Sequence, residues 1–280
     1  MTWRMRVRHT TGYRYDSEVT ASYNEARLMP QTGPAQLTLE STVVTSPRAR
    51  QQRYRDYWGT QVVSFDVHAP HTELEVVATS VVETADALAP PEAAGWDLLR
   101  SDAVRDRHVE LLVPSARALP DDALLAVAQE VKAGRPYETM MEAVERVHDH
   151  VAYRPGTTGV STSAVEAWQL GAGVCQDIAH VSLAVLRALG IPARYVSGYL
   201  HPGGPDAVVG ETVRGESHAW VEVWLGRWWG FDPTNAVPAG ERHVVVARGR
   251  DYGDVPPLKG VYSGGGSQSL GVVVEVTRLA

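Results

Sequence analysis

Apolar and polar residues alternate with a period of two through most of residues 1–86, a pattern typical of β-strands with one buried face. The positions expected to face inward in two of these segments are Met5, Val7 and His9, and Leu37, Leu39 and Ser41. Two more alternating segments, QVVSFDVHAP and LEVVATSVVET, follow after glycine, proline and polar residues. Several short strands at this spacing predict a β-sandwich-like N-terminal domain over residues 1–86.

Residues 87–115 begin with ALAPPEAAG, in which paired prolines interrupt both helix and strand, and we interpret them as a linker or connecting segment. Beyond this segment the apolar spacing becomes that of helices, in DDALLAVAQEVKAG and in YETMMEAVERVHDHVAYRP. Residues 116–280 are therefore expected to form a second domain that begins with helices.

One helix of the second domain is apolar almost all round and begins near Val174. Such a helix should be buried, and Gly190 and Pro192 provide its end. The segments ARYVSGYL, HAWVEVWL and WWGFDPT then have strand patterns, with a Gly-Arg hairpin turn between the last two. GVYSGGGSQS is expected to be a flexible loop, and LGVVVEVTRL a strand that closes the second domain. The two domains together predict an α+β protein.

The composition is that of an ordinary globular protein, with 44% hydrophobic and 21% charged residues. The formal net charge is -7, and both signs are mixed along the chain. The one basic cluster comprises Arg48, Arg50, Arg53 and Arg55, which we interpret as a solvated strand face. The overall acidic balance argues against a nucleic-acid partner.

The single cysteine excludes an intrachain disulfide and so gives no sign of an oxidising compartment. The first residues lack the apolar core of a signal peptide, and no apolar run reaches the roughly 18–20 residues that span a bilayer. We therefore expect a cytoplasmic protein without a membrane partner. The glycine-rich stretches lack the spacing of phosphate or dinucleotide loops, so no cofactor is expected. The sequence leaves the oligomeric state open.

The only cysteine, Cys175, falls in the first turn of the predicted buried helix. Unpaired N–H groups and the positive end of the helix dipole favour an anion at this position. Helix N-termini lower the pKa of a thiol below its usual value of about 8.5, and the thiolate is the reactive form. The position leaves two interpretations of Cys175 open, a nucleophile and a small buried hydrophobic residue.

A nucleophilic cysteine needs a histidine and an orienting group, and the strands that follow supply both. His218 begins HAWVEVWL, and Asp232 lies across the predicted hairpin in GFDPTN. The antiparallel return would bring Asp232 beside His218, where it would orient the imidazole. Taken alone, His218 also fits a satisfied polar residue, and Asp232 fits a turn former before Pro233. The ordered set favours catalysis, because all three residues fall on elements that can converge.

The signatures G-V-C-Q-D, G-I-P-A-R-Y-V-S-G-Y, H-A-W-V-E-V and F-D-P-T-N resemble the core of the transglutaminase-like superfamily. The N-terminal half, with YRYDSEV, ARLMPQ and DYWGTQVVSF, resembles the β domain that precedes this core in bacterial members. Members often have Asp-x-x-Gly-Asn where this chain has Asp56, Gly59 and then Thr60, a departure that should affect only a turn.

The resemblance implies a papain-like transglutaminase core, in which a nucleophile helix packs on an antiparallel sheet. It implies Cys175 as the nucleophile, His218 as base and acid, and Asp232 as the residue that orients His218. The Cys175 thiolate would attack an amide or ester carbonyl, and a thioester acyl-enzyme would form.

The backbone N–H of Cys175 is the first candidate for an oxyanion donor, because it lies at the helix N-terminus. A second donor, or a wall of the substrate cleft, is expected among Gln176, Tyr199 and Trp220. Each of these three also fits a packing role in its helix or strand. Asp177 fits either an acceptor near the site or an acid of the first helical turn.

Water as the acceptor gives hydrolysis and an amine gives transamidation, and the three residues by themselves do not choose between them. We expect a peptide or small amide substrate and hydrolysis, as in a protease or amidase. Transamidation by a true transglutaminase is an alternative. A non-catalytic binding or scaffold protein is an alternative of another class, and the presence of all three residues argues against it.

A metal hydrolase built on His180, His201 and His218 lacks a recognised ligand spacing, so no metal is expected. The loop at residues 201–217 is rich in Gly and Pro and lies just before His218. Both a lid over the site and an ordinary surface connection fit this loop.

Overall fold

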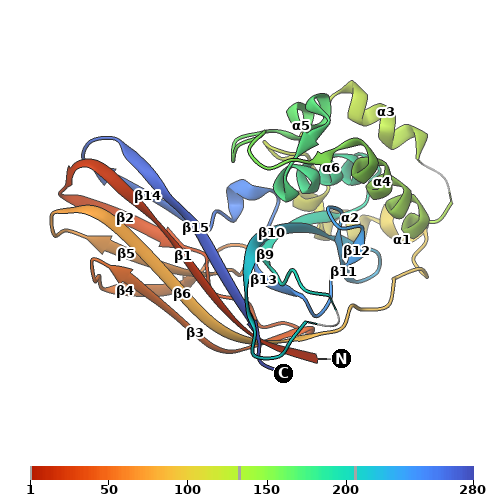
Figure 1. The fold of residues 1–280 in the computed structure, drawn as a ribbon. Helices are drawn as coiled ribbons and strands as arrows, with labels where there is room; N and C mark the ends of the chain where they lie inside the picture. Colours follow the sequence, from red (N-terminus) through yellow and green to blue (C-terminus); the bar gives the residue numbers. More distant parts are fainter. Residues whose placement is uncertain (1, 132–133, 205–206) are drawn as a thin grey trace.

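The structure, a computed structural model, describes residues 2–131, 134–204 and 207–280 (Figure 1). The N-terminal strands are β1 (Thr2–Val19), β2 (Ala21–Ala26), β3 (Gln36–Ser46), β4 (Gln51–Arg55), β5 (Gln61–Val67) and β6 (His71–Ala85). The helices are α1 (Trp96–Arg100), α2 (Asp102–Arg107), α3 (Asp122–Glu130), α4 (Pro136–His150), α5 (Ala164–Leu170) and α6 (Cys175–Ala188), with short 3-10 turns at Val109–Leu111 and Tyr252–Asp254. The later strands are β7 (Ala152–Tyr153), β8 (Ala172–Gly173), β9 (Ala193–Leu200), β10 (Thr212–Trp224), β11 (Trp228–Asp232), β12 (Val237–Pro238), β13 (His243–Gly249), β14 (Leu258–Ser263) and β15 (Ser267–Arg278).

The N-terminal strands form two facing antiparallel sheets, which confirms the predicted sandwich and the α+β class. One sheet has the order β14-β2-β5-β4, and the other contains the run β15-β1-β6-β3. Alternate side chains of both sheets are buried between them, among them Phe65, Leu74 and Val76. The period-two pattern of the sequence produces this arrangement, because successive side chains of a strand point to opposite faces.

The inward positions predicted for β3 are wrong in part. Leu37 and Leu39 are exposed, whereas Val43 and Thr45 face the sandwich core. A β-bulge between Thr38 and Glu40 adds one residue to β3 relative to β6. Because one extra residue inverts the alternation, the apolar positions on either side of the bulge belong to different faces.

The loop predicted at GVYSGGGSQS is also wrong, since only residues 264–266 lie outside strands there. These three glycines carry the chain from the β14 sheet to the β15 sheet, close to the β1–β2 corner. A Cβ on Gly266 would lie 2.4 Å from the Asp16 carboxylate, and one on Gly264 would lie 2.8 Å from Val19. Glycine therefore permits a close approach of the backbone to β1.

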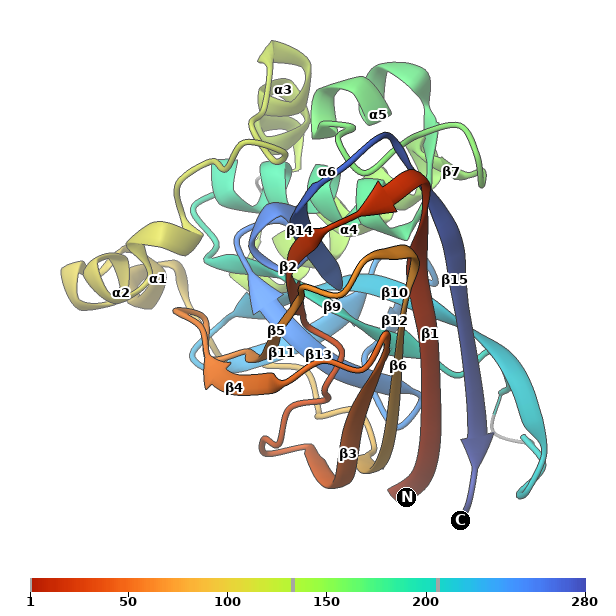
Figure 2. The same cartoon turned by 90° about the vertical axis from the view of Figure 1, so that its left-hand side faces the viewer.

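The last two strands belong in space to the N-terminal sandwich, although the sequence pattern predicts that all of residues 116–280 belong to the second domain. β14 pairs with β2, and β15 pairs with β1 along most of its length. The expected connecting segment, 87–115, contains α1 and α2. The chain thus leaves the sandwich after β6 and returns to it at the end (Figures 1 and 2).

Strand β10 joins the sandwich to the rest of the molecule. Its first residues, 212–215, pair with β15, and its later residues pair with β9 and β11. One continuous sheet therefore runs from β3 to β12. The main hydrophobic core follows it, because Trp3, Met5 and Val7 of β1 are buried in the same cluster as α6.

Helix α6 occupies the centre of this core, as its apolar sequence predicted. It contacts α3, α4 and α5 on its outer side and β9 and β10 on the other (Figure 1). It ends at Ala188, and Gly190 follows with a positive φ of 79°, which glycine adopts without strain. Within the described ranges, no helix is both long and apolar enough to cross a membrane.

Candidate active site

Cys175 is the first residue of α6, as predicted, and its thiol is half-buried and free. Just before it, Gly173 of β8 passes so close to the helix that a Cβ there would lie 2.7 Å from that of Asp177. The Asp177 carboxylate accepts a hydrogen bond of 2.8 Å from the Val174 N–H. This bond satisfies one of the free N–H groups at the helix start and fixes the turn that presents the thiol.

The loop before Cys175 is tied to the residues that flank the thiol. The Thr158 hydroxyl donates to Asp177 Oδ2 at 2.6 Å, and the Gln176 side-chain amide donates to the Gly159 carbonyl at 3.4 Å. Asp177 is fully buried, and burial, the largest cause, raises its pKa. Gln176 therefore binds this loop, and Asp177 caps the first turn of α6.

His218 lies in the middle of β10 and not at the start of a strand, as was predicted. β10 begins earlier, at Thr212, because its first residues find a partner in β15. His218 stands opposite Gly198 of β9 in the strand register. The turn between β10 and β11 then brings Asp232 back to it, so that His218 Nε2 donates to Asp232 Oδ2 at 2.7 Å.

The Asp232 carboxylate is completely buried and accepts hydrogen bonds on both oxygens. Oδ1 accepts from the N–H groups of Thr234 and Asn235, and Oδ2 accepts from His218, from the Asn235 side chain at 2.7 Å and from His243 at 3.1 Å. Burial by itself would raise the pKa of Asp232, but hydrogen bonds from the two imidazoles and the positive charge of protonated His218 lower it well below its usual range. Asp232 is therefore an anion at neutral pH.

His218 connects Asp232 to Cys175. Burial opposes protonation of its ring, but hydrogen bonds to Asp232 and Cys175, and the charges of both, raise the pKa of His218 to about 10. Since Nε2 is bonded to Asp232, Nδ1 is the ring nitrogen that remains for the thiol. The structure thus brings the three predicted residues together, and the raised pKa of His218 favours the protonated imidazole.

Two residues at the site were not singled out from the sequence, His243 and Asn235. Asn235 belongs to the F-D-P-T-N signature, which offered a signal for it. His243 comes from β13, which pairs with β9, and its pattern HVVVARG resembles any buried strand. Its proximity to Asp232 depends on strand order, which local patterns do not reveal.

The aromatic residues expected at the cleft are buried in packing positions. Tyr199 donates its hydroxyl to the Leu28 carbonyl at 3.4 Å, and its ring meets His9 edge-on. Trp220 stacks on His218 with ring centroids 6.1 Å apart and is 1% exposed. Burial, the largest cause, and the charge of Cys175 both raise the pKa of Tyr195. Tyr195 is therefore close enough to Cys175 to interact with it electrostatically.

The histidines of the metal alternative, His180, His201 and His218, do not gather into a metal-ligating group among the residues that the structure places. A different trio has that chemistry, since ligand atoms of His218, Asp232 and His243 lie within 4.8 Å of one another. Their separations of 2.7 and 3.1 Å from Asp232 Oδ2 are those of hydrogen bonds.

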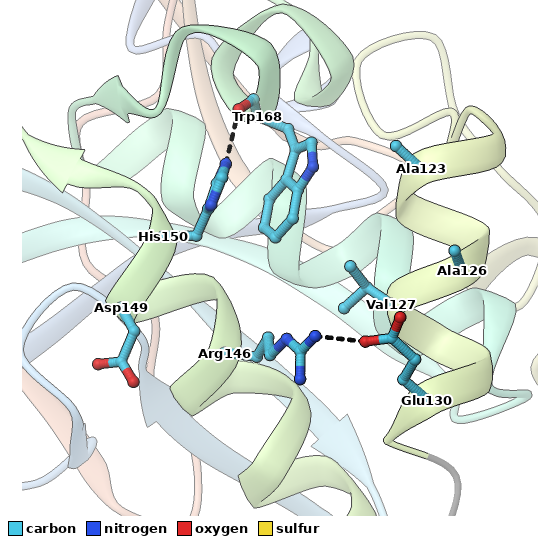
Figure 3. A pocket seen from close by; sticks show the side chains of 8 residues that line it. All are labelled: Ala123, Ala126, Val127, Glu130, Arg146, Asp149, His150 and Trp168. Carbon is cyan, nitrogen blue, oxygen red and sulfur yellow. Dashed lines mark hydrogen bonds and ion pairs between the residues drawn. The ribbon is translucent and has the colours of Figure 1, made fainter.

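Several cavities are lined by residues other than Cys175 and His218. One of about 340 Å³ between α3, α4 and α5 contains the Arg146–Glu130 ion pair and His150, stacked on Trp168 at 3.8 Å (Figure 3). Another of about 460 Å³ lies where the sandwich meets the core, and Trp220 and His243 form part of its wall.

The predicted loop at 201–217 is shorter in the structure, because its last residues, from Thr212, belong to β10. Its centre, residues 205–206, lies outside the described residues, so the lid interpretation stays a prediction.

Comparisons with known proteins match both halves of the chain. Residues 5–83 match the family described as "Bacterial transglutaminase-like N-terminal region", and residues 125–233 match the "Transglutaminase-like superfamily". An uncharacterized protein of Mycobacterium leprae is 50% identical over 99% of this chain and 100% of its own length.

A solved structure and a named enzyme are also similar to this chain. The crystal structure of a candidate cysteine protease from Cytophaga hutchinsonii superposes with a TM-score of 0.81 and 25% identity, over 100% of this chain and 92% of that one. A protein-glutamine gamma-glutamyltransferase of Pseudomonas aeruginosa is 35% identical, over 44% of this chain and 19% of its own length.

Proposed function

The chain belongs to the transglutaminase-like superfamily, and on that premise we propose that it is a papain-like cysteine enzyme that transfers acyl groups. The observation that carries this proposal is the hydrogen bond of 2.7 Å between His218 Nε2 and the buried Asp232 carboxylate, with Cys175 at the first residue of α6 close enough to raise the pKa of His218. The thiol at a helix N-terminus and a carboxylate that holds the histidine ring are the parts that nucleophilic catalysis requires.

The proposed reaction begins with Cys175 as a thiolate and His218 protonated. The sulfur attacks the carbonyl carbon of an amide, and the backbone N–H of Cys175 stabilises the oxygen anion that forms. His218 gives its proton from Nδ1 to the leaving amine, the C–N bond breaks, and a thioester remains on Cys175. A water molecule then gives a proton to His218 and attacks the thioester. The acid leaves, and the thiolate and protonated His218 are restored.

We propose hydrolysis of a peptide or small amide as the overall reaction, as in a protease or amidase. The similarity to the Cytophaga structure supports it, because that likeness extends over the whole chain. Transamidation is the second candidate, and the similarity to the Pseudomonas gamma-glutamyltransferase favours it over a shorter segment. An amine would then replace water at the thioester.

We propose that the protein acts in the cytoplasm, because a chain with a single cysteine forms no intrachain disulfide that would require an oxidising compartment. The proposal needs no cofactor, metal or nucleic acid, because the Cys175–His218 pair and Asp232 supply the nucleophile, the acid and the base. Detection of the protein in fractionated cells would test the location.

Alkylation of Cys175 by iodoacetamide, followed by intact mass from about pH 5 to about pH 9, tests the activated pair. The wild type should react rapidly well below the pKa of an ordinary thiol, and His218→Ala should react slowly there. Because the chain has one cysteine, Cys175→Ser is the matched blank. Equal and slow labelling of both proteins would contradict catalysis and favour the scaffold alternative.

The same variants then decide the acceptor. Peptide and small amide substrates would be incubated with and without a primary amine, and the products identified by mass. Release of free acid in both conditions supports hydrolysis, whereas an amide product that appears only with the amine supports transamidation. Cys175→Ser should form neither product.

A further inference from the structure

His243 reaches the site from a strand that the mechanism above does not use. It begins β13, which pairs with β9, and its side chain is 3% exposed. Its Nε2 lies 3.1 Å from Oδ2 of Asp232, the same oxygen that accepts from His218. Two imidazoles therefore share one oxygen of a buried carboxylate.

The hydrogen bonds of His243 determine which of its nitrogens carries the proton. The Gly240 N–H can only donate, and it lies 3.2 Å from His243 Nδ1, so Nδ1 accepts and carries no proton. The proton of the neutral ring is then on Nε2, which donates to Asp232. Burial, the largest cause, lowers the pKa of His243, so the ring stays neutral.

A neutral donor suits this position for an electrostatic reason. A charged His243 would repel the protonated His218, and it would compete with His218 for the electrostatic attraction of the Asp232 carboxylate. As a neutral ring it restrains the carboxylate and leaves the net charge of Asp232 available to His218. With Asn235, it gives Oδ2 two further donors beside His218.

We propose that His243 is a positioning residue, whose Nε2–H holds Asp232 so that Oδ2 stays aimed at His218. This inference rests on the proposed function, because it assigns His243 a part in activating Cys175.

The N-terminal sandwich supports the strand that carries His243. The Gln36 side-chain amide donates to the Val245 carbonyl at 2.9 Å, and its oxygen accepts from the Val245 N–H at 2.7 Å. Gln36 thus pairs with β13 at its bulge, between Val245 and Ala247, as a strand neighbour would. The sandwich therefore contributes to the site through β13.

The test compares three variants by the pH profile of Cys175 alkylation and by thermal melting. His243→Met removes the N–H donor and fills the same space with an apolar side chain of similar size. His243→Gln keeps an N–H donor near the position of Nε2. His201→Met is the matched control, since His201 is also buried and also accepts from a glycine N–H, that of Gly203 at 3.0 Å, but packs on Trp3.

We expect His243→Met to slow labelling near pH 6 about tenfold, the order of a lost hydrogen bond to a charged group, and to move the profile to higher pH. His243→Gln should stay within about threefold of wild type, and His201→Met should keep the wild-type profile. A purely structural role would lower the melting temperature without moving the profile. An activated wild type with an unchanged profile in His243→Met would overturn this proposal alone.

If wild type and His218→Ala label alike, both the proposed function and the role of His243 are overturned. A measurement on the wild type covers the case in which His243→Met does not fold. Long-range proton–nitrogen NMR of histidine-labelled protein near pH 7 should show His243 neutral, with its proton on Nε2. A proton on Nδ1, or a doubly protonated ring, would overturn the proposal without any variant.

Discussion

The Nε2 atom of His218 lies 2.7 Å from Oδ2 of Asp232, although the two residues are 14 positions apart in sequence. This bond occupies Nε2, leaves Nδ1 for the thiol and helps to raise the pKa of His218 to about 10. The folded protein thus binds a proton at His218 more tightly than an ordinary histidine does. Proton binding there stabilises the fold below pH 6.5 and loses that effect as the pH rises through about 10.

Asp232→Asn should weaken this effect, because an amide carries no negative charge. The pKa of His218 would fall, the proton would return to the thiol at neutral pH, and the alkylation profile of Cys175 should move up by roughly one pH unit or more. The measurement is the iodoacetamide rate from about pH 5 to about pH 9. A variant profile that overlays the wild type would show that Asp232 does not control the pair.

His9 should make the protein less stable in acid. Its ring is 1% exposed, and neither nitrogen has a hydrogen-bond partner in the described part of the chain, so burial lowers its pKa from 6.5 to about 4. Between pH 6.5 and pH 4 the His9 ring is protonated in the unfolded chain but neutral in the native state. This difference lowers the free energy of unfolding by about 2 kcal/mol at pH 5. His9→Phe should lack this cost.

The test is urea unfolding of wild type and His9→Phe near pH 7.5 and near pH 5. Any packing cost of the larger ring is common to both pH values, so the difference between the two proteins should shrink, or change sign, in acid. Parallel loss of stability in both proteins would contradict the prediction.

Gly198 should tolerate no side chain. A Cβ there would lie 2.0 Å from the Val244 carbonyl oxygen and 2.7 Å from the Trp220 ring. Gly198→Ala must therefore push β13 away or displace the ring that stacks on His218. We expect a loss of roughly 1–3 kcal/mol or more and slower Cys175 labelling near pH 6.

Gly33→Ala is the control for this substitution, because nothing lies within 4 Å of a Cβ at that position. It should melt like the wild type and label at the same rate. If Gly198→Ala behaved as Gly33→Ala does, the close packing of β9, β13 and Trp220 would be refuted.

Thr158→Val should loosen the loop beside the thiol. Thr158 donates to the buried carboxylate of Asp177, whose other oxygen, Oδ1, finds no hydrogen-bond partner among the described residues. Removing the donor should cost roughly 1–3 kcal/mol and speed amide exchange around residues 156–160. Thr157→Val is the neighbouring control, since the Thr157 hydroxyl is exposed and bonds to the Arg154 carbonyl. Equal exchange in the two variants would exclude a specific role for the Thr158 bond.

The second domain should not fold when residues 116–280 are made alone. β15 would lose β1 and β14 would lose β2, which leaves long unpaired strand edges. We expect insoluble protein, and recovery of soluble protein when residues 1–115 are produced in the same cells as a separate chain. A soluble monomer of residues 116–280 with a cooperative melt would contradict the continuity of the sheet.

Local patterns in the sequence were enough to predict α6 and the place of Cys175 in it. A helical segment that is apolar all round, and that is followed by Gly190 and Pro192, is expected to be a buried helix. The alternation of β1 likewise placed Met5, Val7 and His9 inside. These features depend on residues close together in sequence, where spacing reflects backbone geometry directly.

The position of His218 within β10, the inversion at the β3 bulge and the return of β14 and β15 to the sandwich depend on pairing between distant segments. Period-two patterns show that a strand has an inner face but do not identify its partner or its register. The buried places of Tyr199 and Trp220 follow from the same pairing, since β9, β10 and β13 meet there.

Local sequence patterns were sufficient for the secondary structure around Cys175 and for the two residues, His218 and Asp232, that are proposed to activate it. The groups around Asp232 follow instead from the tertiary fold, because His243 lies on a strand that pairs with β9 and whose bulge is bonded to Gln36. A hydrogen bond to a buried carboxylate depends on strand order and register across the whole sheet. Those relations are fixed by long-range packing, which no local spacing of residues encodes.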